Sequence, residues 1–294
     1  MDVIAITTVF GNVPVDQAVI NAKRIVKLCD RNEVPIYRGC SCPFTGVRTY
    51  PGAIPHLVHG YDGLGDVPRV APDAAQFDSE PTSDKHASVV ISELVTQMPD
   101  EITLIAMGPL TNIAVAAALN PNVLNKLKEV YLMGGNVYGI GNISSQAEAN
   151  FGHDADSASS VLNRLTIPVT IVPWELCINY GPSPIDPKVD YEPYRRATPS
   201  KIGAFLTAVG GTFRAFVRKT NDKPPMFIDE ITVAACLEPN VIQSCVRHPV
   251  DVEMHGKHTR GQMLVKWNET SSNVRIVTKY DHALVSDMMR NSCM

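Results

Sequence analysis

Residues 102–106 (ITLIA) and 130–133 (VYLM) are two short runs of apolar and β-branched residues, and residues 107–119 (MGPLTNIAVAAAL) follow the first of them. Each run has the length and composition of a strand that is buried on both faces. Gly108 and Pro109 predict a turn, and residues 112–119 predict a helix after it. A strand, a helix and a second strand in this order predict a βαβ unit with parallel strands.

The rest of the chain continues this alternation. Further strands are predicted at residues 3–9 (VIAITTV), 169–172 (VTIV), 250–253 and 263–267, and helices at 15–28, 155–165, 201–219 and 230–237. This order predicts an α/β, Rossmann-like fold in which an open, mostly parallel sheet carries helices on both faces. Because the 294 residues contain no internal repeat or low-complexity tract, we expect a single domain over residues 1–294.

The composition excludes several classes of protein. With 26 Lys and Arg against 30 Asp and Glu, the formal net charge of −4 argues against nucleic-acid binding, which needs a basic surface. No apolar run reaches the ~18 residues that cross a bilayer, so we expect no membrane association. The 7 cysteines lack the spacing of a disulfide framework, and the start of the chain lacks the pattern of a secretory signal. We therefore expect free thiols and a cytoplasmic location.

Polar residues gather after the predicted strands. In an open parallel sheet, ligands bind beyond the carboxyl ends of the strands. The residues found there are Thr7, Thr8, Gly11 and Asn12 after the first strand, Met107 to Asn112 after the second, Gly134 to Asn136 after the third, and Trp174 and Glu175 after the fourth. The segment 142–150 (NISSQAEAN) adds Asn142, Glu148 and Asn150, whose amides and carboxylate could bind the vicinal hydroxyls of a sugar.

Some of these residues also have purely structural explanations. Thr111 and Asn112 are good N-cap residues for the next helix. Gly134 and Gly135 could simply form a tight turn between a strand and a helix. Asp229 follows an apolar stretch and opens a predicted helix, which fits either an N-cap or a buried ligand of a hard metal ion.

The histidines do not indicate a zinc site. His59 and His153 stand alone, without an HxxxH pair or a Cys/His cluster. We therefore expect a structural role for each of them rather than metal binding.

Several motifs follow one another along the chain: residues 6–12 (ITTVFGN), 59–66 (HGYDGLGD), 108–114 (GPLTNIA), 131–135 (YLMGG), 141–158 (GNISSQAEANFGHDADSA), 249–253 (PVDVE) and 258–261 (HTRG). Together, and in this order, they resemble the motifs of the inosine/uridine-preferring nucleoside hydrolases. The resemblance implies hydrolysis of the N-glycosidic bond of ribonucleosides to ribose and free base, with a Ca²⁺ ion that binds the attacking water. It also implies a homodimer or homotetramer.

The resemblance carries roles to individual residues. It implies that Asp229 and the backbone carbonyl of Met107 bind calcium, and that Asn12, Asn142, Glu148 and Asn150 contact the ribose. Asp229, Glu148 and Asn150 are the expected catalytic residues. Anionic groups around the sugar would stabilise an oxocarbenium-like transition state, and fixed sugar hydroxyls would favour the reactive geometry.

The chain departs from the family in its aspartate motif. The family's DxDxGxDD motif supplies most of the calcium carboxylates and the general base, and this sequence contains no such motif. We therefore expect a chain that is N-terminally truncated relative to the family, with the first strand of the fold absent, its neighbouring strands unpaired on one edge, and calcium binding and activity impaired. The alternative is a non-catalytic member that binds a ribosyl ligand or acts through oligomer contacts.

A second departure concerns the leaving base. Ile228 stands before Asp229, where the family often has a histidine or an aromatic residue. Isoleucine can neither protonate nor stack on a base. Activation of the leaving base would therefore have to come from elsewhere, and the candidates are Trp174, His153 and His59.

Overall fold

Five strands form the central sheet of the computed structural model, which describes the chain except residues 47–57, 68–82, 179–187, 196–199, 221–225 and 294. The strand order is β3 (Thr103–Ala106), β4 (Glu129–Met133), β5 (Val169–Val172), β9 (Val274–Tyr280) and β6 (Ile242–Arg247). The first four strands are parallel, and only β6 runs antiparallel to its neighbour. The predicted α/β fold with a mostly parallel sheet is therefore confirmed.

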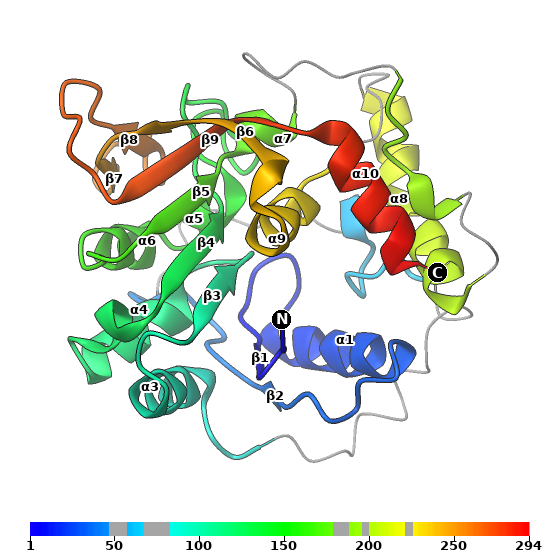
Figure 1. Ribbon diagram of the computed structural model, residues 1–294, viewed down its shortest axis with the longest axis horizontal. Coiled ribbons are helices and arrows are strands. Elements are labelled where there is room, and N and C mark those ends of the chain that lie inside the picture. Colours follow the sequence, from blue (N-terminus) through cyan, green and yellow to red (C-terminus); the bar gives the residue numbers. More distant parts are fainter. Residues whose placement is uncertain (47–57, 68–82, 179–187, 196–199, 221–225, 294) are drawn as a thin grey trace.

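Two small sheets accompany the central one. Their strands are β1 (Ile6–Thr7) with β2 (Ile36–Tyr37), which are parallel, and β7 (Val250–Val252) with β8 (Met263–Val265), which are antiparallel. Thus β1 and β3 belong to different sheets, although they run through the same part of the molecule (Figure 1). Among the strands that the structure describes, each of the two pairs on one side only.

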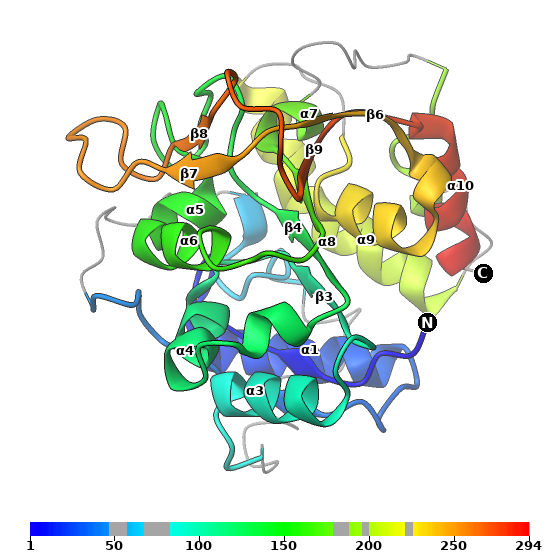
Figure 2. The same cartoon turned by 60° about the vertical axis from the view of Figure 1, so that its left-hand side comes forward.

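Helices lie on both faces of the central sheet (Figures 1 and 2). One face packs against α3 (Ala87–Gln97), α4 (Thr111–Leu119) and α6 (Ala155–Leu162), and the other against α7 (Trp174–Cys177), α9 (Asp229–Leu237) and α10 (His282–Ser292). The remaining helices are α1 (Val15–Leu28), α5 (Ala149–His153), α8 (Lys201–Thr220) and the short 3-10 turns Val123–Lys126, Pro193–Arg195 and Pro239–Val241.

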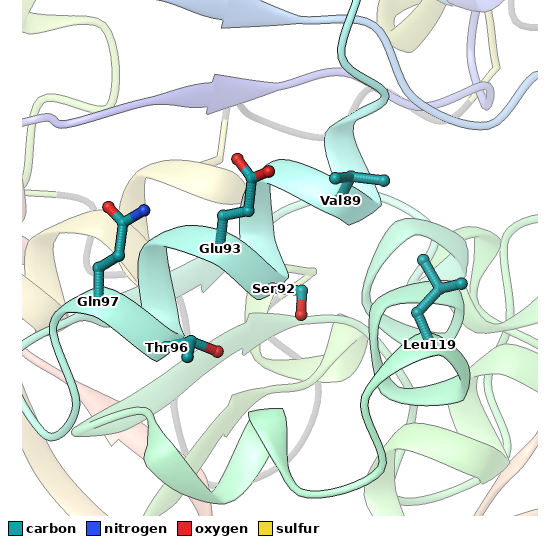
Figure 3. A pocket seen from close by; sticks show the side chains of 6 residues that line it. All are labelled: Val89, Ser92, Glu93, Thr96, Gln97 and Leu119. Carbon is teal, nitrogen blue, oxygen red and sulfur yellow. The ribbon is translucent and has the colours of Figure 1, made fainter.

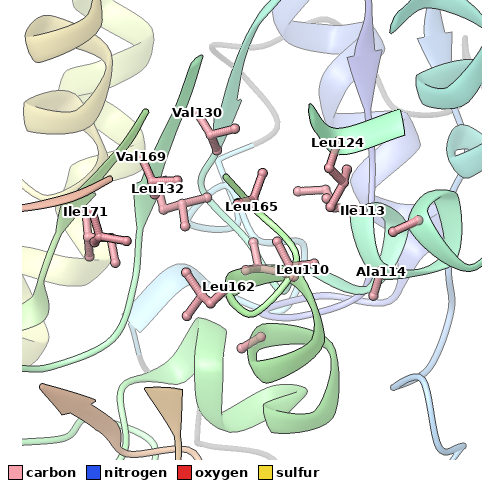
Figure 4. Packing of buried hydrophobic residues seen from close by; sticks show 14 of the residues in the cluster. Leu110, Ile113, Ala114, Leu124, Val130, Leu132, Leu162, Leu165, Val169 and Ile171 are labelled. Atoms are coloured by element: carbon pink, nitrogen blue, oxygen red, sulfur yellow. The ribbon is translucent and has the colours of Figure 1, made fainter. Parts of the chain in front are cut away.

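Strand β4 shows why helices cover both faces of the central sheet. Successive side chains of a strand point to opposite faces. Val130 and Leu132 lie in the hydrophobic cluster beneath α4 and α6, while Tyr131 and Met133 lie in the cluster beneath α9 and α10. Figure 4 shows the first cluster. Since both faces are buried, the strand reads as a continuous apolar run rather than an alternating one.

The central sheet is expected to tolerate little loss of volume. Ile171 of β5 is fully buried, so Ile171→Val is expected to lower the free energy of unfolding by about 1 kcal/mol. Ile25 of α1 is 39% exposed, and Ile25→Val serves as the control, with an expected change of only a few tenths (~0.3 kcal/mol). Urea denaturation of both variants measures the difference; equal losses would contradict this account of the core.

The predicted first strand is longer than the observed one. Residues 3–9 were expected to form a buried strand, but only Ile6–Thr7 does so, and Val3 and Ile4 are exposed. The backbone N–H groups of Ile6, Thr8 and Phe10 donate to the β2 side, and the carbonyl of Thr8 accepts from the side chain of Asn112. A strand with one short neighbour buries less of its length. No helix in the described ranges is long and apolar enough to cross a membrane.

Candidate functional site

The loops after β1 and β3 lie against each other. A Cβ atom on Gly108 would lie 3.2 Å from Val9 Cγ1, and one on Gly11 would lie 3.5 Å from Pro109 Cδ. The loop that contains His59 joins them, since a Cβ on Gly63 would lie 2.6 Å from Val13 Cγ1. The chain segments that carry Asn12, Met107 and His59 are therefore neighbours. Asn12 and Met107 are both exposed.

Thr111 and Asn112 tie these loops to the rest of the site. The N-cap residue of α4 is Leu110, and it makes no side-chain cap. Asn112 instead donates to the carbonyl of Thr8 (2.8 Å) and accepts from the N–H of Cys40 (2.8 Å). Thr111 Oγ1 donates to Asp154 Oδ2 (2.5 Å). The N-cap explanation of this pair is wrong, and the two residues make tertiary contacts.

A ring contact links the β1 loop to α5. The rings of Phe10 and His153 meet edge to face, with centroids 6.1 Å apart. His153 therefore packs as an aromatic residue, in agreement with its expected structural role. Because α5 begins beside Glu148 and contains Asn150, this contact places the two groups of predicted residues in the same region.

Glu148 holds the turn after β4 together. Its side chain is almost completely buried, and its carboxylate accepts hydrogen bonds from the backbone N–H groups of Gly135 (2.9 Å), Asn150 (2.7 Å) and Phe151 (3.1 Å). Gly135 is required here, because its φ is +71° and a Cβ would lie 2.9 Å from Met263 Sδ. Burial raises the pKa of Glu148 to about 7, although the three N–H groups oppose that shift.

The stability of the protein is expected to depend on this carboxyl. Its folded pKa exceeds the ordinary value of 4.5, so the folded state holds more protons between pH 4.5 and about 7. The contribution of Glu148 to the free energy of unfolding is fully present below pH 4.5 and is lost as the pH rises through about 7. The expected change is on the order of 3 kcal/mol. Urea denaturation at several pH values should show this fall. Glu148→Gln should flatten it, whereas Asp281→Asn, at the N-cap of α10, should not.

Asn150 and Trp174 are held beside Glu148. Asn150 Nδ2 donates to the carbonyl of Met133 (2.9 Å), which leaves its amide oxygen as an acceptor. The backbone N–H of Trp174 donates to the carbonyl of Gly135 (3.0 Å), which holds Trp174 beside the turn that Glu148 also binds. Both side chains are partly exposed.

Asn142 is tied by a backbone hydrogen bond to Ala147, the residue that precedes Glu148. Its backbone N–H donates to the carbonyl of Ala147 (3.0 Å), and its side chain is exposed. Three of the residues expected to contact a sugar, Asn142, Glu148 and Asn150, are thus joined through consecutive backbone groups.

Asp229 is the first residue of α9 and does not cap it. The N-cap residue is Ile228, whose N–H donates to Glu230 Oε2 (2.8 Å), so the N-cap explanation of Asp229 is wrong. Removal from water and repulsion by Glu230 and Glu148 raise the pKa of Asp229. The repulsion places Asp229 and Glu148 within electrostatic reach of each other. Because Asp229 is exposed to solvent, water screens this repulsion.

Ile228 and His59 offer little acid catalysis for a leaving base. Ile228 is partly buried against the hydrophobic cluster beneath α9, where its side chain contributes packing. Burial lowers the pKa of His59, which favours the neutral imidazole at pH 7. Neutral His59 can donate a hydrogen bond but is a weak source of protons.

The predicted calcium ligands do not make a complete site among the described residues. Ca²⁺ takes about six to eight oxygen ligands. Asp229 and the carbonyl of Met107 supply at most three, and the described part of the chain contains no group of three or more His, Cys, Asp or Glu side chains suited to a metal ion. Among the described residues, these groups alone are too few to hold a calcium ion.

Glu175 is a part of the site to which the sequence assigned no role. Its buried carboxylate accepts from the N–H groups of Val137 (2.8 Å), Tyr138 (2.8 Å) and Ile140 (3.3 Å). The available signal was a charged residue soon after the buried strand β5, which ends at Val172, but the partners of Glu175 lie 35 to 38 residues away in sequence.

A surface hollow elsewhere contains none of these residues. It lies between α3 and α4 and is lined by Val89, Ser92, Glu93, Thr96, Gln97 and Leu119 (Figure 3). Glu93 is the one charged side chain among these lining residues, and no histidine is present beside the hydroxyls of Ser92 and Thr96 to activate them. The amide and carboxylate groups suited to a polyol remain at the carboxyl ends of the strands.

An α/β protein with carboxylates and amides around the carboxyl ends of its parallel strands belongs to the class that binds small polar ligands at that edge. The family model of the inosine-uridine preferring nucleoside hydrolases matches residues 1–287. This chain therefore belongs to the inosine-uridine preferring nucleoside hydrolase family.

Individual relatives agree with this assignment. An inosine-uridine preferring nucleoside hydrolase from Leishmania major is 32% identical over 268 residues, which cover 90% of this chain and 79% of that protein. A plant nucleoside hydrolase, the PpNRh1 enzyme, has a TM-score of 0.85 at 25% identity and is matched over 99% of this chain and 90% of its own. A purine-preferring ribonucleoside hydrolase from Gardnerella vaginalis has the same TM-score at 26% identity, with the same coverage.

Proposed function

We propose that this chain binds ribonucleosides by their pentose at the carboxyl edge of the sheet and serves hydrolysis of the N-glycosidic bond to ribose and free base. The observation that carries the proposal is the connected set of Glu148, Asn150 and Asn142 around the turn at Gly135, within electrostatic reach of Asp229. Family membership supports the reaction class. The relatives' names combine inosine, uridine and purine preferences, so we assign ribonucleosides as a class.

The chain's own groups suit sugar recognition. The Glu148 carboxylate already accepts three N–H bonds, two at Oε2 and one at Oε1, so it is fixed in place and keeps one acceptor site, on Oε1, for a sugar hydroxyl. Two nearby carboxylates would also favour positive charge on the sugar ring as the bond to the base breaks. In the reaction, water adds its oxygen to the anomeric carbon, the C–N bond breaks, and the base leaves with a proton. Asn150 and Asn142 would orient the hydroxyl groups.

Membership of the family also leads us to propose that a Ca²⁺ ion assists the attack of water on the anomeric carbon. Asp229 and the Met107 carbonyl are the residues that would bind the ion, and when bound it would polarise the attacking water. The shortage of oxygen ligands among the described residues favours impaired turnover in this chain. It also supports the second candidate function, which is ribosyl binding without turnover.

One experiment separates the two candidates. Uridine and inosine are mixed with the protein, with and without Ca²⁺, and ribose release and the dissociation constants are measured. Ribose release that Asp229→Ala abolishes supports hydrolysis. Binding that Glu148→Gln weakens, without ribose release, supports the second candidate. If neither nucleoside binds, the proposed function is wrong.

The quaternary state and location are further proposals from the resemblance. We propose a homodimer or homotetramer in the cytoplasm. Light scattering on the eluted protein measures the mass in solution, and a mass of about 32 kDa, that of one chain, would contradict the oligomer.

A further inference from the structure

We propose that Glu175 is a positioning residue for pentose binding, because its carboxylate fixes the shape of the loop that carries Tyr138 and Asn142. We define this loop as residues 134–147. The inference rests on the proposed function and extends it to a residue that does not itself touch the sugar.

The carboxylate of Glu175 binds one short piece of this loop at three points. Oε2 accepts from Val137 N–H (2.8 Å), and Oε1 accepts from Tyr138 N–H (2.8 Å) and Ile140 N–H (3.3 Å). Glu175 is 1% exposed, so its negative charge is stabilised by these amide dipoles away from water. A charge-assisted hydrogen bond is about twice as strong as a neutral one, and three of them converge here.

The loop has no helix or strand of its own, so anchors of this kind decide its shape. Asn136 provides the second anchor, since its Nδ2 donates to the carbonyls of Ile140 (3.1 Å) and Gln146 (2.6 Å). Glu148 provides the third, at Gly135 N–H. Of the three, only Glu175 holds the N–H groups of residues 137, 138 and 140.

The anchored segment packs Val137 against the hydrophobic core and leaves other groups at the surface. Tyr138 is 52% exposed, and Asn142, four residues later, is also exposed. Glu175 lies near enough to Glu148 that their charges repel. The loop therefore begins beside the buried carboxylate of the proposed site and returns to it at Ala147. If the segment 137–140 moved, Asn142 would be displaced relative to Glu148.

A purely structural role predicts a different result from a positioning role. Loss of a buried carboxylate that only supports the fold lowers stability alone, whereas loss of Glu175 should lower stability and also weaken pentose binding. Glu175→Gln keeps the shape of the side chain and removes one acceptor and the charge. Asp281→Asn changes a comparable carboxylate, which accepts the N–H of Leu284 at the start of α10, and is the matched control.

The test measures the dissociation constants of uridine and D-ribose by calorimetry, together with hydrogen exchange of the loop amides, in the full chain. For Glu175→Gln we expect about tenfold weaker binding and faster exchange at residues 137–140. Asp281→Asn should bind like the wild type. If Glu175→Gln does not fold, Glu175→Asp, which is one methylene shorter and keeps the charge, should show about threefold weaker binding.

The outcomes are distinguishable. Unchanged binding by a folded Glu175 variant, with a wild type that binds, overturns the positioning role and leaves the proposed function intact. Equal weakening in Asp281→Asn also overturns it, because a general loss of stability would then explain the effect. A wild type that binds neither probe overturns both proposals.

Discussion

Glu148→Ala is expected to lower the free energy of unfolding by about 4 kcal/mol at pH 5.5 and to abolish detectable pentose binding. The wild-type side chain satisfies three backbone N–H groups in a place that water does not reach. Each buried donor left without a partner costs about 1–3 kcal/mol, and partial entry of water reduces the sum.

The pH dependence gives this prediction a second check. Because burial raises the pKa of Glu148 to about 7, the wild type loses stability between pH 4.5 and 7, and the alanine variant does not. The difference between the two proteins should therefore shrink at pH 8. Urea denaturation at both pH values measures it, with Asp281→Ala as a control for the loss of a helix cap, expected at about 1 kcal/mol. A difference that is larger at pH 8 would falsify the account of this carboxyl.

Asp229→Asn is expected to weaken uridine binding by about tenfold or more, and to remove any ribose release, without lowering the melting temperature. Asp229 is exposed as a residue, but partial loss of hydration of its carboxyl and repulsion by Glu230 and Glu148 raise its pKa and so disfavour its negative charge. Neutral asparagine relieves this repulsion. A group that weakens the fold but strengthens ligand binding is the pattern expected of a functional residue.

The measurement compares calorimetric binding and thermal denaturation at pH 8, where the carboxyl is mostly ionised. Asp287→Asn is the matched control, since it removes one exposed charge on α10 outside the site. It should bind uridine like the wild type. A clear drop in melting temperature for Asp229→Asn would instead show that the side chain is structural.

The central sheet was predictable where the chain is buried on both faces. The run 169–172 predicts β5 with its observed bounds, and residues 15–28 predict α1 in the same way. Strand β9 was missed, although it lies between β5 and β6. Its sequence, VRIVTKY, places Arg275 and Lys279 within the run, so it does not read as a buried strand. Arg275 finds a partner in Thr170 of β5, at 2.7 Å, which no local pattern reveals.

In the candidate site, too, the sequence identified residues but not their hydrogen-bond partners. Motifs identified Asp229, Glu148, Asn150, Asn142 and Asn12 as candidates, and the structure places their segments around neighbouring strand ends. The sequence left open whether Thr111, Asn112 and Asp229 were helix caps. The structure excludes that role for each, because the N-cap residues are Leu110 and Ile228. Hydrogen-bond partners depend on distances between segments, which sequence spacing does not define.

The sequence by itself determined the α/β class and the family, because hydrophobic runs and ordered motifs are local properties of the chain. Only the tertiary structure decided what the carboxylates do. Glu148 and Glu175 look equally polar in sequence, but Glu148 caps α5 through the N–H groups of Asn150 and Phe151 and also binds Gly135, whereas all three N–H partners of Glu175 lie 35 to 38 residues away. A buried charge needs partners wherever the fold brings donors, so the role of Glu175 is fixed by packing and not by its neighbours in sequence.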